Sequence, residues 1–187
     1  HPVLRTPVLD EIGGLGAHFT RATSTCPSCI PARRALLTGQ FPATGGMVGF
    51  RGDPLTVPTL PALLRRGGYA TRLAGRHMHQ EPYEEAYGYE EQLLGSTYIP
   101  HDDYARFLDE RAPHVGGIRG VASSFNGWHA HPWPLGADLH PTNWTAAAAR
   151  RLLAAAPDGK PLFLTASTYA PHPPLVPPAW YLDYYLR

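Results

Sequence analysis

The sequence predicts an α/β protein in which helices sandwich a sheet, and two stretches of the chain carry this prediction. A helix, a glycine stop and a strand follow one another between Thr59 and Gly75, and a helix followed by a strand recurs between Thr142 and Thr168. Helices that alternate with strands in this way are typical of parallel sheets covered by helices. The 187 residues are enough for one domain with a core, and no clear linker divides them.

The first half of the chain contains three expected helices and one expected strand. A short helix begins at Pro7 and ends in glycines, because proline is favoured in the first helical turn. The run "IPARRALLTG" predicts a helix that begins just after Cys29 and stops at Gly39. Thr59 caps a third helix that ends at the following glycines, and residues 69–75 are expected to form a strand.

The second half is expected to hold long loops and one further helix–strand pair. Residues 81–135 are rich in Tyr, Gly, Trp and His, and we expect one helix near 103–110 among loops. A strong helix with Thr142 as its cap leads through a Pro-Asp-Gly turn to a buried strand at 161–168. This strand leads into the loop "YAPHPPLVPP". Loops at the carboxyl ends of parallel strands commonly hold ligands.

Composition excludes several classes of function. The 16 basic and 15 acidic residues give a net charge of +1 and are interspersed, so no basic tract indicates a nucleic-acid partner. No apolar run approaches the roughly 20 residues that a membrane span needs. Two cysteines are too few for a disulfide framework. The sequence does not indicate a compartment.

Cys26 and Cys29 are the two cysteines, and their spacing admits several kinds of chemistry. A structural zinc site would need a second ligand pair, which the chain does not offer at finger spacing. A redox pair at a helix N-terminus is physically sensible, but no compact thioredoxin-like pattern surrounds it. Cys26 can also be a buried, inert thiol.

The residues after Cys29 indicate a reaction. The run "CIPARRALLTG" resembles the signature C-x-P-[S/T/A]-R-x-x-L-L-T-G of the type I sulfatases, in the alkaline phosphatase superfamily. This resemblance implies an alkaline-phosphatase-like fold, and oxidation of Cys29 to formylglycine by a formylglycine-generating enzyme that recognises C-x-P-x-R. Cys26 does not fit that pattern, because Ser28 and Ile30 stand at its proline and arginine positions.

Two further blocks resemble the family in the same order, namely "VPTLPALLRRGGYATRLAGRHMH" and "KPLFLTASTYAPHPPLVPP", and residues 6–20 resemble the segment that precedes the signature. Residues 96–139 match no block. In this family the hydrated formylglycine attacks sulfur, expels the alcohol and then releases sulfate, which is covalent catalysis in two steps. The resemblance implies that Cys29, Arg33, Arg76, His79 and His172 form the catalytic site.

The expected roles follow from the resemblance together with the chemistry of these side chains. Arg33 lies one helical turn after residue 29 and can offset negative charge, whereas Arg34 fits a surface arginine. Arg76 stands where the family commonly has lysine, and His172 can protonate the leaving group. The histidine of the second block is either His77 or His79, and we favour His79.

The family also binds a divalent cation, usually calcium, which takes six to eight oxygen ligands. The resemblance places an aspartate pair before Thr6, and an Asp-Asn pair and a lysine after Arg187, so Cys29 is the expected metal ligand within the chain. We therefore expect residues 1–187 to be a partial sulfatase catalytic domain, incomplete at both ends and inactive alone.

The predicted function is hydrolysis of a small-molecule or carbohydrate sulfate ester through formylglycine at position 29. One alternative is a phosphonate monoester or phosphodiester hydrolase of the same superfamily, which would share the nucleophile. Another is a degenerate, non-catalytic relative that binds a sulfated ligand. The unusual block "GRHMH" motivates this last alternative.

Overall fold

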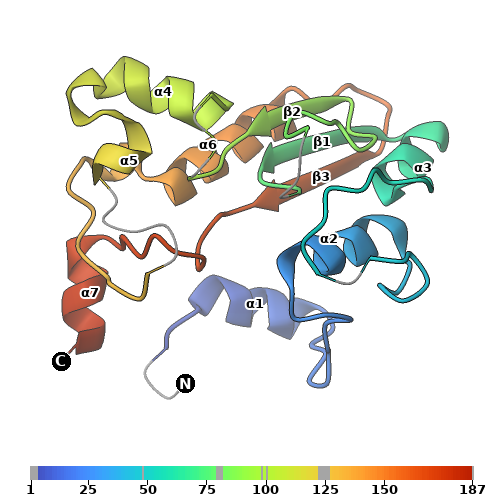
Figure 1. Cartoon of the computed structure of the whole chain (residues 1–187), viewed down its shortest axis with the longest axis horizontal. Helices are drawn as coiled ribbons and strands as arrows, with labels where there is room; N and C mark the ends of the chain where they lie inside the picture. Colours follow the sequence, from blue (N-terminus) through green and yellow to red (C-terminus); the bar gives the residue numbers. More distant parts are fainter. Residues whose placement is uncertain are drawn as a thin grey trace.

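A computed structural model describes residues 4–47, 49–78, 82–97, 99, 101–121 and 127–186. Over these residues helices alternate with strands along the chain (Figure 1). The elements are α1 (Pro7–Leu15), α2 (Cys29–Thr38), α3 (Leu60–Arg66), β1 (Ala70–Gly75), β2 (Glu91–Leu94), α4 (Asp103–Arg111), η1 (Pro113–Val115), α5 (Gly117–Val121), η2 (Ala137–Leu139), α6 (Pro141–Ala154), β3 (Leu162–Ser167) and α7 (Ala179–Leu186).

The three described strands form one parallel sheet in the order β2-β1-β3 (Figure 1). Residues 70–75 of β1 pair with residues 162–167 of β3, and residues 72–75 pair with residues 91–94 of β2. Parallel strands bring their carboxyl ends to one edge of a sheet. The segments that follow Gly75, Leu94 and Ser167 therefore leave the sheet side by side.

Helices cover both faces of this sheet. Leu73 of β1 and Phe163 of β3 lie in one apolar cluster with Ile30 and Leu37 of α2. Ala74, the next residue of β1, lies in another cluster with residues 148–152 of α6. Successive strand residues point to opposite faces, so the two clusters lie on opposite sides of the sheet. The predicted sandwich of a sheet between helices is confirmed.

A third apolar cluster lies under the helices that precede α6. Tyr104 and Leu108 of α4 are fully buried there, together with Trp133 and Val176 from loops far apart in sequence. The Tyr104 hydroxyl donates to the carbonyl oxygen of Leu139. This cluster joins α4 and α5 to the loop that follows β3.

The expected helices and strands are found, with several differences. The cap of α6 is His140 and not Thr142, because the His140 ring accepts a hydrogen bond from the Thr142 backbone N–H. The strand β3 is half-buried and not buried, since β1 pairs with it along one side and residues 163–166 are partly or fully exposed. The short strand β2 and the short helices η1 and α5 fall within the stretch expected to be loop, and the helix α7 was not expected. Arg34 is buried and not on the surface, and its guanidinium donates to the Asp53 and Pro54 carbonyls.

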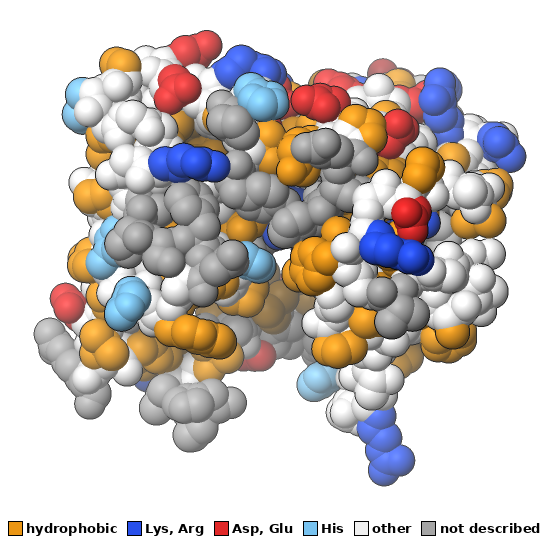
Figure 2. All heavy atoms as spheres, viewed as in Figure 1, with side chains coloured by type: hydrophobic (Ala, Val, Ile, Leu, Met, Phe, Trp, Pro, Cys, Tyr) orange, Lys and Arg blue, Asp and Glu red, His pale blue; other side chains and the backbone are white. Residues whose placement is uncertain are grey.

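Charged side chains of both signs lie close together on the face shown in Figure 2, and its described part has no continuous basic surface. None of the helices in the described ranges is long and apolar enough to cross a bilayer. The helix α1 has no buried residue, and Val8, Leu9, Ile12 and Leu15 on it are exposed.

Gly75 ends β1 in a conformation that no other residue can adopt there. Its φ is +98°, and a Cβ atom at this position would lie 2.0 Å from the carbonyl oxygen of Ser167. We expect Gly75→Ala to lower the free energy of unfolding by more than about 2 kcal/mol, because the clash is with backbone. Urea unfolding of the purified variant measures this loss.

Gly13→Ala is the matched control for this substitution. Gly13 lies within α1, and a Cβ atom there meets nothing within 4 Å. Alanine favours a helix over glycine by about 0.5–1 kcal/mol, so this variant should be as stable as the parent or slightly more so. Equal stability of the two variants would contradict the close approach at Gly75.

Candidate active site

The candidate site lies where three segments meet at the carboxyl edge of the sheet. The N-terminus of α2, the residues after β1 and the loop after β3 contribute Cys29, Arg76 and His172 respectively. The backbone N–H of Arg76 donates to the Ser167 carbonyl at 3.1 Å, which joins the segments after β1 and β3. Ligands of parallel α/β sheets commonly bind at this edge.

Cys29 is the first residue of α2 and is partly exposed. Its thiol and that of Cys26 are free. Ser28 is the N-cap of α2, but no side chain caps the helix by a hydrogen bond. The first N–H groups of a helix carry partial positive charge, so this end of α2 suits an anion beside residue 29.

Arg33 holds α2 against the segment that follows β1. Its Nη1 atom donates to the carbonyl oxygens of Arg76 at 3.3 Å and His77 at 2.9 Å. The guanidinium therefore lies between the helix and the residues after Gly75. This position agrees with the expectation that Arg33 lies near residue 29, one helical turn away.

Arg76 is almost completely buried, with 4% of its surface exposed. Its guanidinium carbon lies 5.0 Å from the centroid of the Tyr169 ring, which is a cation–π distance. Arg76 therefore faces the loop after β3. The planar guanidinium can stack on a ring in a way that the compact ammonium of lysine cannot match.

His172 joins the group through Tyr169. The two rings lie 4.9 Å apart, and the Tyr169 hydroxyl lies 2.9 Å from Nδ1 of His172. The same Nδ1 lies 2.7 Å from the Pro173 carbonyl oxygen. A carbonyl oxygen only accepts, so we assign the ring hydrogen of neutral His172 to Nδ1. Nε2 is then the ring atom that exchanges a proton.

Tyr169 was not predicted from the sequence as a site residue, but it lies close to the expected catalytic residues. Burial raises the pKa of Tyr169, and the nearby Thr97 hydroxyl and the charge of Arg76 lower it. Cys29 raises this pKa and Arg33 lowers it, so both lie within electrostatic range of the phenol. The signal in the sequence was its position three residues before His172, directly after a strand.

His77, one of the two candidate histidines of the second block, is buried among aromatic side chains. His77 is 7% exposed, and the centroid of its ring lies 4.9 Å from that of Tyr87 and 6.5 Å from that of Tyr89. Both tyrosines belong to the apolar cluster that packs against α2. Burial lowers its pKa to about 4. A buried neutral ring suits a packing role, which favours His79, but His79 lies outside the described residues.

Asp102 holds the loop that carries Thr97. Its carboxylate accepts hydrogen bonds of 2.7 Å from the backbone N–H groups of Ser96 and Ala105. Burial raises the pKa of this carboxyl to about 7, against the opposing effect of those two N–H donors. Asp102 thereby caps α4 and positions the segment after β2 beside Tyr169.

Two cavities adjoin the candidate residues. One of about 290 Å³ is lined by Arg33, Arg76, His77 and the hydroxyl residues Thr165 and Ser167, together with apolar side chains. The other, of about 550 Å³, is lined at one end by Thr97, Tyr169 and His172 and elsewhere mainly by apolar residues. Arg76 lines the first and stacks on Tyr169, which lines the second.

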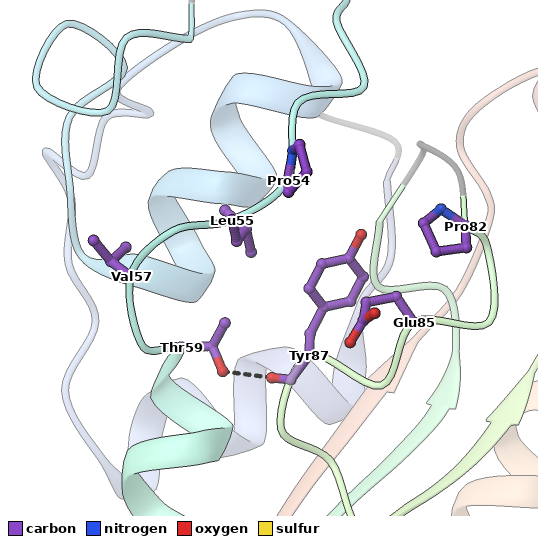
Figure 3. Close-up of a pocket in the computed structure, with 7 residues that line it drawn as sticks. All are labelled: Pro54, Leu55, Val57, Thr59, Pro82, Glu85 and Tyr87. Atoms are coloured by element: carbon purple, nitrogen blue, oxygen red, sulfur yellow. Dashed lines mark hydrogen bonds between the residues drawn. The ribbon is translucent and has the colours of Figure 1, made fainter.

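The cavity in Figure 3 has a different character. It measures about 250 Å³ and is lined by Pro54, Leu55, Val57, Thr59, Pro82, Glu85 and Tyr87, and the Thr59 hydroxyl donates to the Tyr87 carbonyl at its base. Its charged lining residue is the carboxylate of Glu85, and its lining includes no arginine, lysine or histidine. An anionic ester would be repelled there, so we place the candidate site at the arginine-lined edge.

Within the described ranges, no three His, Cys, Asp or Glu side chains gather as a metal site. These residues alone therefore do not fit a calcium ion with its six to eight oxygen ligands. Cys29 remains the residue of this chain that we expected to contribute a ligand.

The fold and the site define a class of protein. A parallel sheet between helices carries, at its carboxyl edge, a thiol at a helix N-terminus with two arginines and a histidine nearby. The fold is alkaline-phosphatase-like. A solved phosphonate monoester hydrolase of Agrobacterium radiobacter superposes with a TM-score of 0.78 over 98% of this chain and 40% of that one, at 23% identity.

The model of the sulfatase family matches residues 1–187, and the chain belongs to this family. An arylsulfatase of Clostridium perfringens (strain 13 / Type A) is 30% identical over 200 residues, which cover 97% of this chain and 41% of that protein. Human arylsulfatase A is 34% identical over 116 residues, covering 58% of this chain and 21% of that protein. The chain thus spans less than half the length of these curated relatives.

His77 provides a test of the assignment of the second-block histidine. An unfolded chain takes up a proton on His77 near pH 6.5, whereas the folded chain does so only near pH 4. His77 therefore lowers stability as the pH falls between these values, by up to about 1.4 kcal/mol per pH unit. We expect His77→Asn to remove this part of the pH dependence, measured by urea unfolding at pH 4.5, 5.5 and 6.5.

The same variant separates packing from catalysis. Asn can replace Nδ1 as the acceptor for the Met78 backbone N–H. We expect turnover by the full-length gene product to stay within about threefold of the parent, since Asn keeps this hydrogen bond and only 7% of the His77 surface is exposed. An unchanged pH dependence together with loss of turnover would assign the active-site role to His77.

Proposed function

We propose that the full-length product of the gene hydrolyses a sulfate ester, with formylglycine made from Cys29 as the nucleophile. The observation that carries this proposal is the position of Cys29 at the uncapped N-terminus of α2, with Arg33 one turn further on, in a chain of the sulfatase family. Hydrated formylglycine at this position would supply an oxygen nucleophile in place of the thiol.

The side chains around residue 29 supply positive charge for the sulfuryl oxygens. Arg33 and Arg76 line the same cavity beside Ser167 at the end of β3. A helix N-terminus and guanidinium groups fixed before the reaction need no reorganisation as charge develops on the bound ester. Hydrogen bonds to the 76–77 backbone fix Arg33, and the Tyr169 ring fixes Arg76.

His172 suits the role of acid for the departing alcohol. Nδ1 carries its hydrogen toward the Pro173 carbonyl, so Nε2 is the atom that would give a proton to the ester oxygen. The cavity beside His172 is large and mainly apolar, which supports an aryl sulfate as the first assay substrate. His79 is proposed as a further residue of the site on the strength of the sequence motif.

Calcium is proposed as the cofactor of the whole protein. The described residues do not form its site, and the chain spans 41% of the length of the clostridial relative. We therefore propose that residues 1–187 are a partial catalytic domain. We expect no turnover from these residues alone.

The modification of Cys29 can be tested directly. Co-expression with a formylglycine-generating enzyme should convert Cys29 to the aldehyde, and mass spectrometry of the tryptic peptide of residues 22–33 detects it. Cys26 in the same peptide should remain an alkylatable thiol.

Two variants control this measurement. Cys26→Ser should still carry the aldehyde at position 29, and Cys29→Ser should carry none at position 26. Two alkylatable thiols in the parent peptide, or a disulfide between them, would contradict the proposed nucleophile and favour a redox role.

Activity is tested on the matured full-length gene product with 4-nitrophenyl sulfate. We expect Cys29→Ala to lower kcat at least about 10³-fold, because the nucleophile is removed, and Cys26→Ala to stay within about threefold of the parent. Faster turnover of a phenylphosphonate monoester would favour the phosphonate hydrolase alternative. Binding of sulfated ligands without turnover of either ester would favour the non-catalytic relative.

A further inference from the structure

Tyr169 is the residue that contacts two of the proposed sulfate-handling side chains at once. It is the second residue after β3, is 8% exposed, and lies between Arg76 and His172. The guanidinium carbon of Arg76 lies 5.0 Å from the centroid of the Tyr169 ring, and the Tyr169 hydroxyl oxygen lies 2.9 Å from Nδ1 of His172. The aromatic ring of Tyr169 therefore contacts Arg76, and its hydroxyl contacts His172.

The hydroxyl fixes how the His172 ring is oriented. The Pro173 carbonyl at 2.7 Å and the Tyr169 oxygen at 2.9 Å both lie near Nδ1, and both can accept from the hydrogen on that atom. Two acceptors on one side of the imidazole leave Nε2 on the other. Nε2 is therefore the ring atom that can face a bound ester.

The ring of Tyr169 fixes Arg76. The guanidinium is almost fully buried, so the face of the phenol replaces part of its hydration. Phenylalanine would keep this face and lose the hydroxyl. Leucine would lose both, so the two contacts of Tyr169 can be separated by substitution.

Tyr169 itself stays a neutral phenol at ordinary pH. Burial raises its pKa, and the charges of Arg76 and Arg33 oppose this only in part. The Thr97 hydroxyl lies near the phenol and lines the same cavity. The side chain is thus a fixed dipole and not a proton carrier.

We propose that Tyr169 is a positioning residue that holds His172 as the acid for the leaving alcohol and Arg76 as the cation for the sulfuryl oxygens. This inference rests on the proposed sulfate ester hydrolysis. Because one side chain directly after β3 contacts both residues, it sets the spacing between the acid and the cation. Positioning of this kind lowers the barrier through the two neighbours, and Tyr169 takes no part in the bond changes.

The test compares two aryl sulfates on the matured full-length gene product. Phenyl sulfate has a poor leaving group that needs a proton, whereas 4-nitrophenyl sulfate needs one far less. We expect Tyr169→Phe to lower kcat for phenyl sulfate about tenfold or more and kcat for 4-nitrophenyl sulfate less than about threefold. Tyr169→Leu should in addition lower kcat/KM for both esters, because Arg76 loses its support.

A double-mutant cycle shows whether the effect passes through His172. His172→Ala should itself slow phenyl sulfate hydrolysis, and Tyr169→Phe should cost nothing further in that background. Tyr69→Phe is the matched control, since Tyr69 lies at the other end of β1 and is 37% exposed. This control should leave both rates unchanged.

The outcomes separate the two proposals. A parent protein that hydrolyses neither sulfate contradicts the proposed function. If the parent hydrolyses both esters, three results overturn the positioning role. These are a Tyr169→Phe variant as active as the parent, an equal slowing of both esters, and an effect that adds to that of His172→Ala. A leaving-group-dependent loss that vanishes in the His172→Ala background supports it.

Discussion

The hydrogen bonds from Arg33 to the carbonyls of Arg76 and His77 are the interaction on which the rest of the site depends. They connect the helix that carries residue 29 with the strand end that carries Arg76. Both carbonyls lie just beyond the paired residues of β1, so they are available to a side chain. These bonds thus hold residue 29 of α2 and Arg76, which come from separate elements, at the same edge of the sheet. A cationic donor on two carbonyls is also stronger than a neutral one.

The local signals of the chain predict its regular elements well and its tertiary contacts poorly. The helix at Cys29 and the strand ended by Gly75 are short-range patterns, and both are found. The strand β2 was missed because "EQLL" has no alternation, and pairing with β1 decides its conformation. Arg34 was expected on the surface, but its partners are carbonyls about twenty residues further on. Such partners leave no mark in the local sequence.

The same division applies to the candidate site. The family signature names Cys29 and Arg33, and two further blocks name Arg76 and His172, but none of them names what supports these residues. Tyr169 contacts Arg76, which is distant in sequence, and Asp102 joins its own helix cap to the segment after β2. No motif of the family marks either residue. His77 shows the opposite case. Its sequence position suits catalysis, but its ring is buried beside two tyrosine rings, which the sequence does not indicate.

The apolar side of α1 affects how the described chain behaves in water. Leu9, Ile12 and Leu15 are 67%, 60% and 84% exposed, and their contact with water is unfavourable in proportion to apolar area. Such a surface favours self-association as concentration rises. Residues 1–187 in isolation are therefore expected to remain monodisperse only when dilute, or when a mild amphiphile or an apolar partner covers the helix.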